Sequence, residues 1–242
     1  MKSYKFLFLL FFFQVSMVFS QNNEAAYSDI KKLNKASLIV LLNLNSEKAA
    51  DYRTIKKYKI ADKIEKKLEA KNKLLIKLFT DENFHFCPVY FIEKESYGRI
   101  FNNYNERIFL NKELEIDTSI KLKDDNFLFL DFGSVYELDE QGNQLAPLLQ
   151  NALIFKDKDL KQLIRPFPYY IDLDGVINPI VNFEKYVNNW KNNDNRVVDL
   201  TTYHYYLEDE FDLTEKESYI AEKIFISNVK LFNFLEKALK DK

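Results

Sequence analysis

Residues 37–42, which read SLIVLL, constrain the fold more than any other segment of the chain. A strand with one face in water alternates apolar and polar side chains, and this run does not alternate. It therefore predicts a strand over residues 37–45 that is buried on both faces, with a layer of structure on each side of the sheet. Further candidate strands are FCPVYFIE, residues 126–136, NALIFKD and PYYIDL.

The next stretch, residues 46–80, contains neither glycine nor proline and is rich in Lys, Glu, Leu and Ile. These residues favour helix, and Ser46 is a good N-cap. We expect one long amphipathic helix or two helices that share an axis. A continuous helix of this length would span about 50 Å, longer than a compact domain needs, so a break or a protruding arm is expected.

The lysines of this stretch allow two interpretations. Their face could contact an anionic lipid or polymer. It could instead be a solvated surface whose lysines pair with acidic neighbours such as Glu65 and Glu69, and this simpler interpretation is preferred. The lysines concerned are Lys56, Lys57, Lys59, Lys63, Lys66, Lys67, Lys71 and Lys73.

The second half of the chain predicts more strands and ends in a helix. RIFNN and ERIFL are expected to pair as a short hairpin, GNQLAPLLQ to be a loop, and residues 182–190 to be helical. A capping box at residues 214–217 opens the C-terminal helix. Its expected inward-facing residues are Ile220, Ile224, Phe225, Phe232, Leu235 and Leu239.

Because strands and helices interleave, the fold class is expected to be α/β or α+β. A central mixed sheet would be flanked by helices, among them one long Lys/Glu-rich helix and the C-terminal helix.

The first residues have the layout of a secretory signal peptide. Lys2 and Lys5 precede an uncharged apolar core at residues 6–13, and small serines stand three and one residues before a cleavage point between Ser20 and Gln21. We expect a signal peptide of residues 1–20 and one globular domain of residues 21–242. An uncleaved N-terminal anchor is the alternative. No second apolar run of comparable length follows, so no membrane span is expected in the mature chain.

Charge and cysteine content exclude several kinds of function. Of the 35 basic residues, Lys2 and Lys5 lie in the signal, so 33 basic residues face 37 acidic ones, a net charge of −4. This balance argues against nucleic-acid binding. Cys87 is the single cysteine and is expected to be a buried, inert thiol. Only two histidines occur, His85 and His204, too few for a zinc site, and no cofactor motif is present.

The stretch YYIDLDGVI carries the one candidate catalytic motif. Asp172-x-Asp174-Gly175 resembles the nucleophile motif of haloacid dehalogenase phosphatases. The resemblance implies a Mg²⁺-dependent reaction in which Asp172 attacks phosphorus and Asp174 moves a proton on the leaving group. In that family the motif ends the first strand of the domain. Here four candidate strands precede it and only 67 of the 242 residues follow Gly175.

A β-hairpin is the alternative interpretation of the same stretch. Asp-Gly is a strong signal for a two-residue turn, because both central positions need a positive φ. PYYIDL and VINPIV would be the paired strands, and Pro179 would be tolerated on an edge strand. The hairpin interpretation is preferred, and it assigns no catalytic residue to this chain.

Four segments carry a family resemblance. FHFCPVYFI, IFLNKELEID, NFLFLDFG and RPFPYYI, in this order, resemble parts of exported proteins of unknown function from Gram-negative bacteria. The resemblance implies export but no activity, cofactor or metal. The expected function is therefore a non-enzymatic binding or interaction domain in the periplasm or at the envelope, with an unidentified envelope component or protein as its partner. The alternative is the Mg²⁺-dependent phosphatase that uses Asp172 and Asp174.

Overall fold

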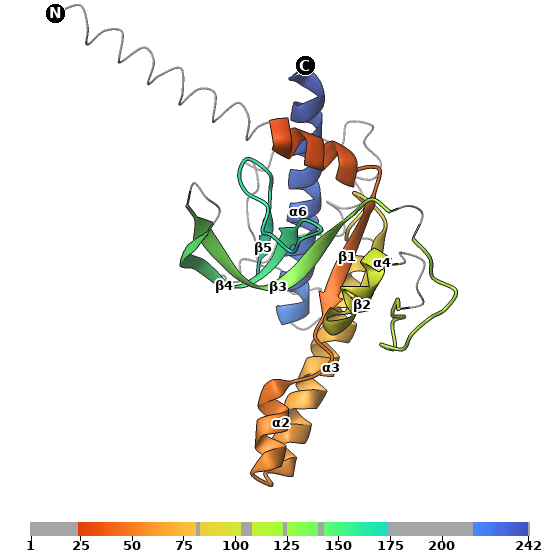
Figure 1. The fold of residues 1–242 in the computed structure, drawn as a ribbon, viewed down its shortest axis with the longest axis vertical. Coiled ribbons are helices and arrows are strands. Elements are labelled where there is room, and N and C mark those ends of the chain that lie inside the picture. Colours follow the sequence, from red (N-terminus) through yellow and green to blue (C-terminus); the bar gives the residue numbers. More distant parts are fainter. Residues whose placement is uncertain are drawn as a thin grey trace, which may run out of the picture.

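The computed structural model describes residues 24–80, 83–102, 108–122, 125–139, 143–173 and 215–241. Its centre is a five-stranded sheet in the order β2-β1-β3-β4-β5 (Figure 1). Strands β2, β1 and β3 run parallel, and β4 is antiparallel to both of its neighbours. The mixed sheet flanked by helices confirms the expected fold class, in its α+β form. The strands are β1 (Ser37–Leu42), β2 (Val89–Glu93), β3 (Phe127–Leu138), β4 (Gln144–Lys156) and β5 (Tyr170–Asp172).

All six residues of β1 are buried, as its unbroken apolar sequence predicts. Side chains alternate between the two faces of a strand. Leu38, Val40 and Leu42 belong to the larger of two hydrophobic clusters, whereas Ile39 and Leu41 belong to the smaller one. The sheet is therefore covered on both faces, and β1 is an interior strand that lies between β2 and β3.

Helices cover the face with the larger cluster. They are residues 24–33, α3 (Tyr58–Thr80) and α6 (Glu215–Lys240), which contribute buried residues such as Ile30, Phe79 and Ile224. The C-terminal helix is thus confirmed. Leu239 is exposed rather than inward-facing, because in the last turn of α6 the buried side chain is Ala238. No described helix is both long and apolar enough to cross a membrane.

The opposite face is covered by η1 (Lys94–Ser96), α4 (Arg99–Asn102) and residues 108–122. The expected pairing of RIFNN with ERIFL is wrong, because Arg99–Asn102 is helical and packs Ile100 into the smaller cluster. Phe109 instead forms an antiparallel bridge with Ile92 of β2.

The expected loop at GNQLAPLLQ is also wrong, because β4 begins at Gln144 and pairs with β3. The outer parts of β3 and β4 form a two-stranded ribbon with register shifts, and it curves away from the sheet (Figure 1). Strand β5 pairs only with residues 152–154, so Pro147 lies where β4 has no described neighbour on its other side. A proline that lacks an N–H donor is tolerated at such an edge.

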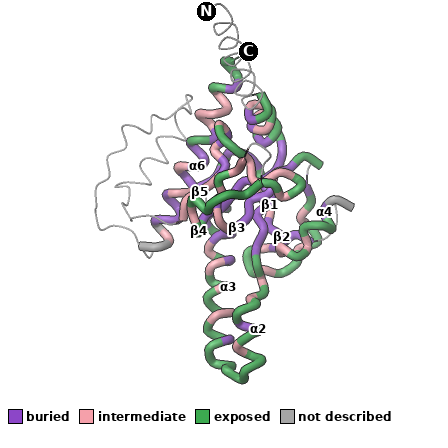
Figure 2. Tube along the Cα trace, turned by 60° about the vertical axis from the view of Figure 1, so that its left-hand side comes forward, coloured by how far each residue is buried: buried purple, intermediate pink, exposed green. Residues whose placement is uncertain are grey.

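The stretch 46–80 is neither one helix nor two helices on one axis. Strand β1 is followed by α2 (Glu47–Thr54), and the chain then turns at residues 55–57, where Lys56 has φ 60°, and folds back into α3. Ser46 Oγ accepts a hydrogen bond from the Ala49 N–H, which confirms the predicted cap. Residues 46–70, which we call the arm, project from the body as the expected protrusion (Figures 1 and 2).

Candidate functional site

The structure places Asp172 at the end of β5, where its register partner is Ala152 of β4. Strand β5 is the edge strand of the described sheet. Asp174, Gly175 and the expected return strand lie outside the described residues, as do His204, the helix expected at residues 182–190 and the signal peptide.

Helix α6 packs beside β5 and brings Lys230 near Asp172. Desolvation and the nearby Lys223 ammonium lower the pKa of Lys230, and the Asp172 carboxylate acts against this shift. The Asp172 carboxylate therefore interacts electrostatically with the Lys230 ammonium group. In the part of the chain that the structure describes, no group of three His, Cys, Asp or Glu side chains could hold a metal ion.

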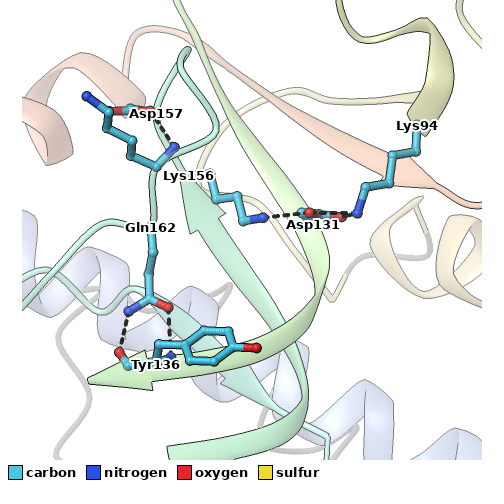
Figure 3. Close-up of polar contacts among 7 residues, drawn as sticks. Lys94, Asp131, Tyr136, Lys156, Asp157 and Gln162 are labelled. Carbon is cyan, nitrogen blue, oxygen red and sulfur yellow. Dashed lines mark hydrogen bonds and ion pairs between the residues drawn. The ribbon is translucent and has the colours of Figure 1, made fainter. Parts of the chain in front are cut away.

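A second carboxylate, Asp131, lies in the interior of the sheet, on β3. Its Oδ1 and Oδ2 accept hydrogen bonds from Lys94 Nζ at 2.8 and 2.9 Å, and Oδ2 also accepts one from Lys156 Nζ at 2.6 Å (Figure 3). Asp131 is only 3% exposed, whereas the side chains of Lys94 and Lys156 are 35% and 21% exposed. We call these three residues the Lys-Asp-Lys cluster.

The fold explains why these residues meet. Asp131 pairs with Leu41 near the end of β1, and Lys94 follows directly after β2. The cluster thus lies at the carboxyl ends of parallel strands, between β1 and β3. Strand β2 lies on the other side of β1, so the strand order changes direction at this point, and such points are where open sheets commonly bind ligands.

The electrostatics of the cluster favour a structural role. A buried carboxylate is stable only when it is paired and hydrogen-bonded, and here two ammonium groups surround one carboxylate. The ion pairs join three segments that are distant in sequence: η1, β3 and β4. A separate polar contact joins β3 to the segment after β4, because the Gln162 amide accepts from the Tyr136 N–H and donates to the Tyr136 C=O (Figure 3).

No local motif of the sequence marks the cluster, and Asp131 lies within the candidate strand at residues 126–136. A signal was present, since a charged residue inside the apolar run NFLFLDF needs a buried partner. Neither lysine could be named, because each is far from Asp131 in sequence and meets it only through strand pairing.

His85 and Cys87 lie just before β2 and differ in exposure. Strand β2 begins only at Val89, and the structure leaves His85 exposed while it buries Cys87. Burial raises the pKa of the Cys87 thiol, so its reactive thiolate form is disfavoured. The expected buried thiol is confirmed.

The tip of the arm, residues 55–60, is the most exposed candidate site. Ile55 is 58% exposed, Tyr58 54% and Ile60 42%, and the lysines between them are exposed as well. Apolar and cationic side chains therefore alternate at the end of a projecting hairpin. This combination suits contact with a surface more than it suits catalysis.

Comparisons with protein-family models, with curated proteins and with solved structures return no match.

Replacing Asp131 with asparagine should lower the free energy of unfolding by about 3 kcal/mol, because two ammonium groups lose their shared counter-charge. Lys94→Met or Lys156→Met alone should cost about 1–2 kcal/mol, since the other lysine still pairs with Asp131. The double lysine variant should cost more than the sum of the two, as it leaves the carboxylate buried without a cation. Denaturant unfolding measures the free energy of unfolding of all four variants.

Glu95→Gln is the matched control, because Glu95 lies beside Lys94 and is exposed. It should change the unfolding free energy by less than about 0.5 kcal/mol. Strictly additive lysine effects would contradict the shared-carboxylate account.

The hairpin interpretation of Asp172 predicts that the purified chain does not turn over an aryl phosphate in the presence of Mg²⁺. A ligand-binding carboxylate in an open sheet normally ends a strand between parallel neighbours, whereas Asp172 ends β5, which pairs with antiparallel β4 at the edge of the described sheet. The assay compares Mg²⁺, chelator and Asp172→Asn. Mg²⁺-dependent turnover that disappears in Asp172→Asn, with an unchanged unfolding midpoint, would establish the phosphatase alternative instead.

Proposed function

We propose that this chain is an exported, non-enzymatic interaction domain that binds a component of the cell envelope through the tip of the arm. The observation that carries the proposal is the exposure of Ile55, Tyr58 and Ile60 at the end of a helical hairpin. Single exposed apolar side chains are common on proteins and need no explanation. Three within six residues, at a point that projects from the body, make a contact surface.

The arm is built to hold this tip in one place. Arg53 on α2 donates hydrogen bonds to Asp62 Oδ1 at 2.9 Å and to Glu65 Oε1 at 3.1 Å on α3, so it ties the two helices together next to the turn. Ala49 and Ala61 are both buried, and such small side chains allow close approach of the two helices. A tip that is ordered before binding loses less conformational entropy on contact.

Export is supported by the sequence of residues 1–20, which has the charged start, apolar core and small-residue ending of a signal peptide. After cleavage the domain would be periplasmic or secreted. The proposal predicts that the protein recovered from the envelope or medium of expressing cells begins at Gln21. Intact-mass measurement tests this step, and a recovered chain that still begins at Met1 would contradict cleavage.

Binding through the tip predicts that the chain beginning at Gln21 sediments with isolated cell envelopes. The Ile55→Ser/Tyr58→Ser/Ile60→Ser variant should lose most of this binding, because it removes the exposed apolar surface without touching a buried residue. The fraction that sediments is measured against envelope concentration.

Leu145→Ser/Leu148→Ser is the matched control, since both leucines are also exposed apolar side chains, but on β4. The control variant should bind as the parent does. Equal loss in both variants would indicate nonspecific hydrophobic adsorption and would remove the tip from the proposal.

A further inference from the structure

We propose that the component bound by the arm tip is an anionic lipid surface, an inference that rests on the tip being the contact site of the proposed function. The tip carries two kinds of side chain that such a surface selects: cations for the head groups and apolar groups for the region beneath them.

The cations of the tip are uncommitted. Arg53 is occupied by Asp62 and Glu65. Within the described part of the chain, neither the tip lysines Lys56, Lys57 and Lys59 nor Lys63, about one helical turn farther along α3, forms an ion pair, and all four are exposed. Four free ammonium groups within eight residues create a local positive charge that an anionic surface would neutralise.

The apolar side chains fit an interface rather than a protein groove. Ile55 and Ile60 can enter the acyl boundary, and a tyrosine such as Tyr58 is favoured at the head-group level, where its ring is apolar and its hydroxyl remains wet. The aliphatic stems of lysines can extend along apolar surface while their charges stay in water. A stable protein complex needs about 800 Å² from each partner, more than a six-residue tip readily offers, whereas a lipid surface needs no complementary shape.

The arm also separates the tip from the acidic body. The chain from Gln21 has 37 acidic and 33 basic residues, and the arm itself holds more basic than acidic residues, so the body is net negative and is not attracted to an anionic surface. Between Tyr58 and Ala70 only Ala61 is buried, and this part of α3 spans about 20 Å at 1.5 Å per residue. Since the Debye length in physiological salt is about 8 Å, the field of the body is largely screened at the tip.

The arm is anchored where the body begins. Lys71 Nζ lies 3.1 Å from the centroid of the Phe132 ring, and Asn72 Nδ2 donates to the Asn43 C=O at 2.7 Å. Lys71 thus belongs to the body, just beyond the arm, and it is not among the lysines proposed to meet lipid.

The test is flotation of the chain beginning at Gln21 with vesicles of phosphatidylcholine alone and with vesicles containing about one third phosphatidylglycerol. We expect binding to the anionic vesicles to be at least about tenfold stronger, and to fall at least about tenfold between about 50 mM and about 500 mM salt. Tyr58→Trp should show a blue-shifted emission increment over the parent when anionic vesicles are added, which reports entry of this residue into the interface.

Two variants with a matched control assign the binding. Lys56→Gln/Lys57→Gln/Lys59→Gln/Lys63→Gln should weaken binding to anionic vesicles at least about tenfold. Ile55→Ser/Tyr58→Ser/Ile60→Ser should weaken it as well. Lys35→Gln/Lys112→Gln/Lys121→Gln/Lys161→Gln removes the same charge from exposed positions on the body and should bind as the parent does.

Three outcomes would overturn the inference. The first is equal binding to neutral and anionic vesicles, and the second is equal loss in the tip and body lysine variants. The third is no vesicle binding while tip-dependent binding to cell envelopes persists, which leaves the proposed function standing with a protein or polymer partner. If the parent chain binds neither vesicles nor cell envelopes, the proposed function itself is rejected.

Discussion

Strand β1 is the constraint on which the other elements depend. Its six residues are buried on both faces, and both of its edges are paired, with β2 on one side and β3 on the other. A strand in this position needs a hydrogen-bonded neighbour at each edge and a hydrophobic cover on each face. The helices cover one face, and residues 94–102 and 108–122 cover the other with Ile100, Phe109 and Leu122.

Asp131 shows how the parallel and antiparallel halves of the sheet are joined. Strand β3 pairs parallel with β1 and antiparallel with β4, so one carboxylate on β3 can reach both sides. Lys94 belongs to the parallel half and Lys156 to the antiparallel half, and both bond to the same group. The buried charge is weak support for stability by itself, but it fixes which segments must lie together.

Local sequence patterns predicted the helices and strands better than they predicted which segments pair or pack together. The unbroken run at residues 37–42 and the Ser46 cap depend on neighbouring residues, so the sequence was sufficient for them. The segment at Gln144 has turn-like composition but is a strand, because pairing with β3 overrides local propensity. The direction of α3 relative to α2 and the partners of Asp131 follow from contacts between distant residues, which periodicity does not encode.

The arm, too, is ordered by contacts between separate segments of the chain. A polar helix as short as α2 would be marginal alone, so its order depends on packing against α3 and on Arg53. Hydrogen bonding to Arg53 lowers the pKa of Glu65 below its usual value. The stabilisation from this pair is therefore present above the unfolded-state pKa of a glutamate and is lost only as the pH falls through the lowered value. The ion pair between Arg53 and Glu65 therefore persists at neutral and mildly acidic pH. In that range the two helices of the arm stay tied together, and the tip stays exposed.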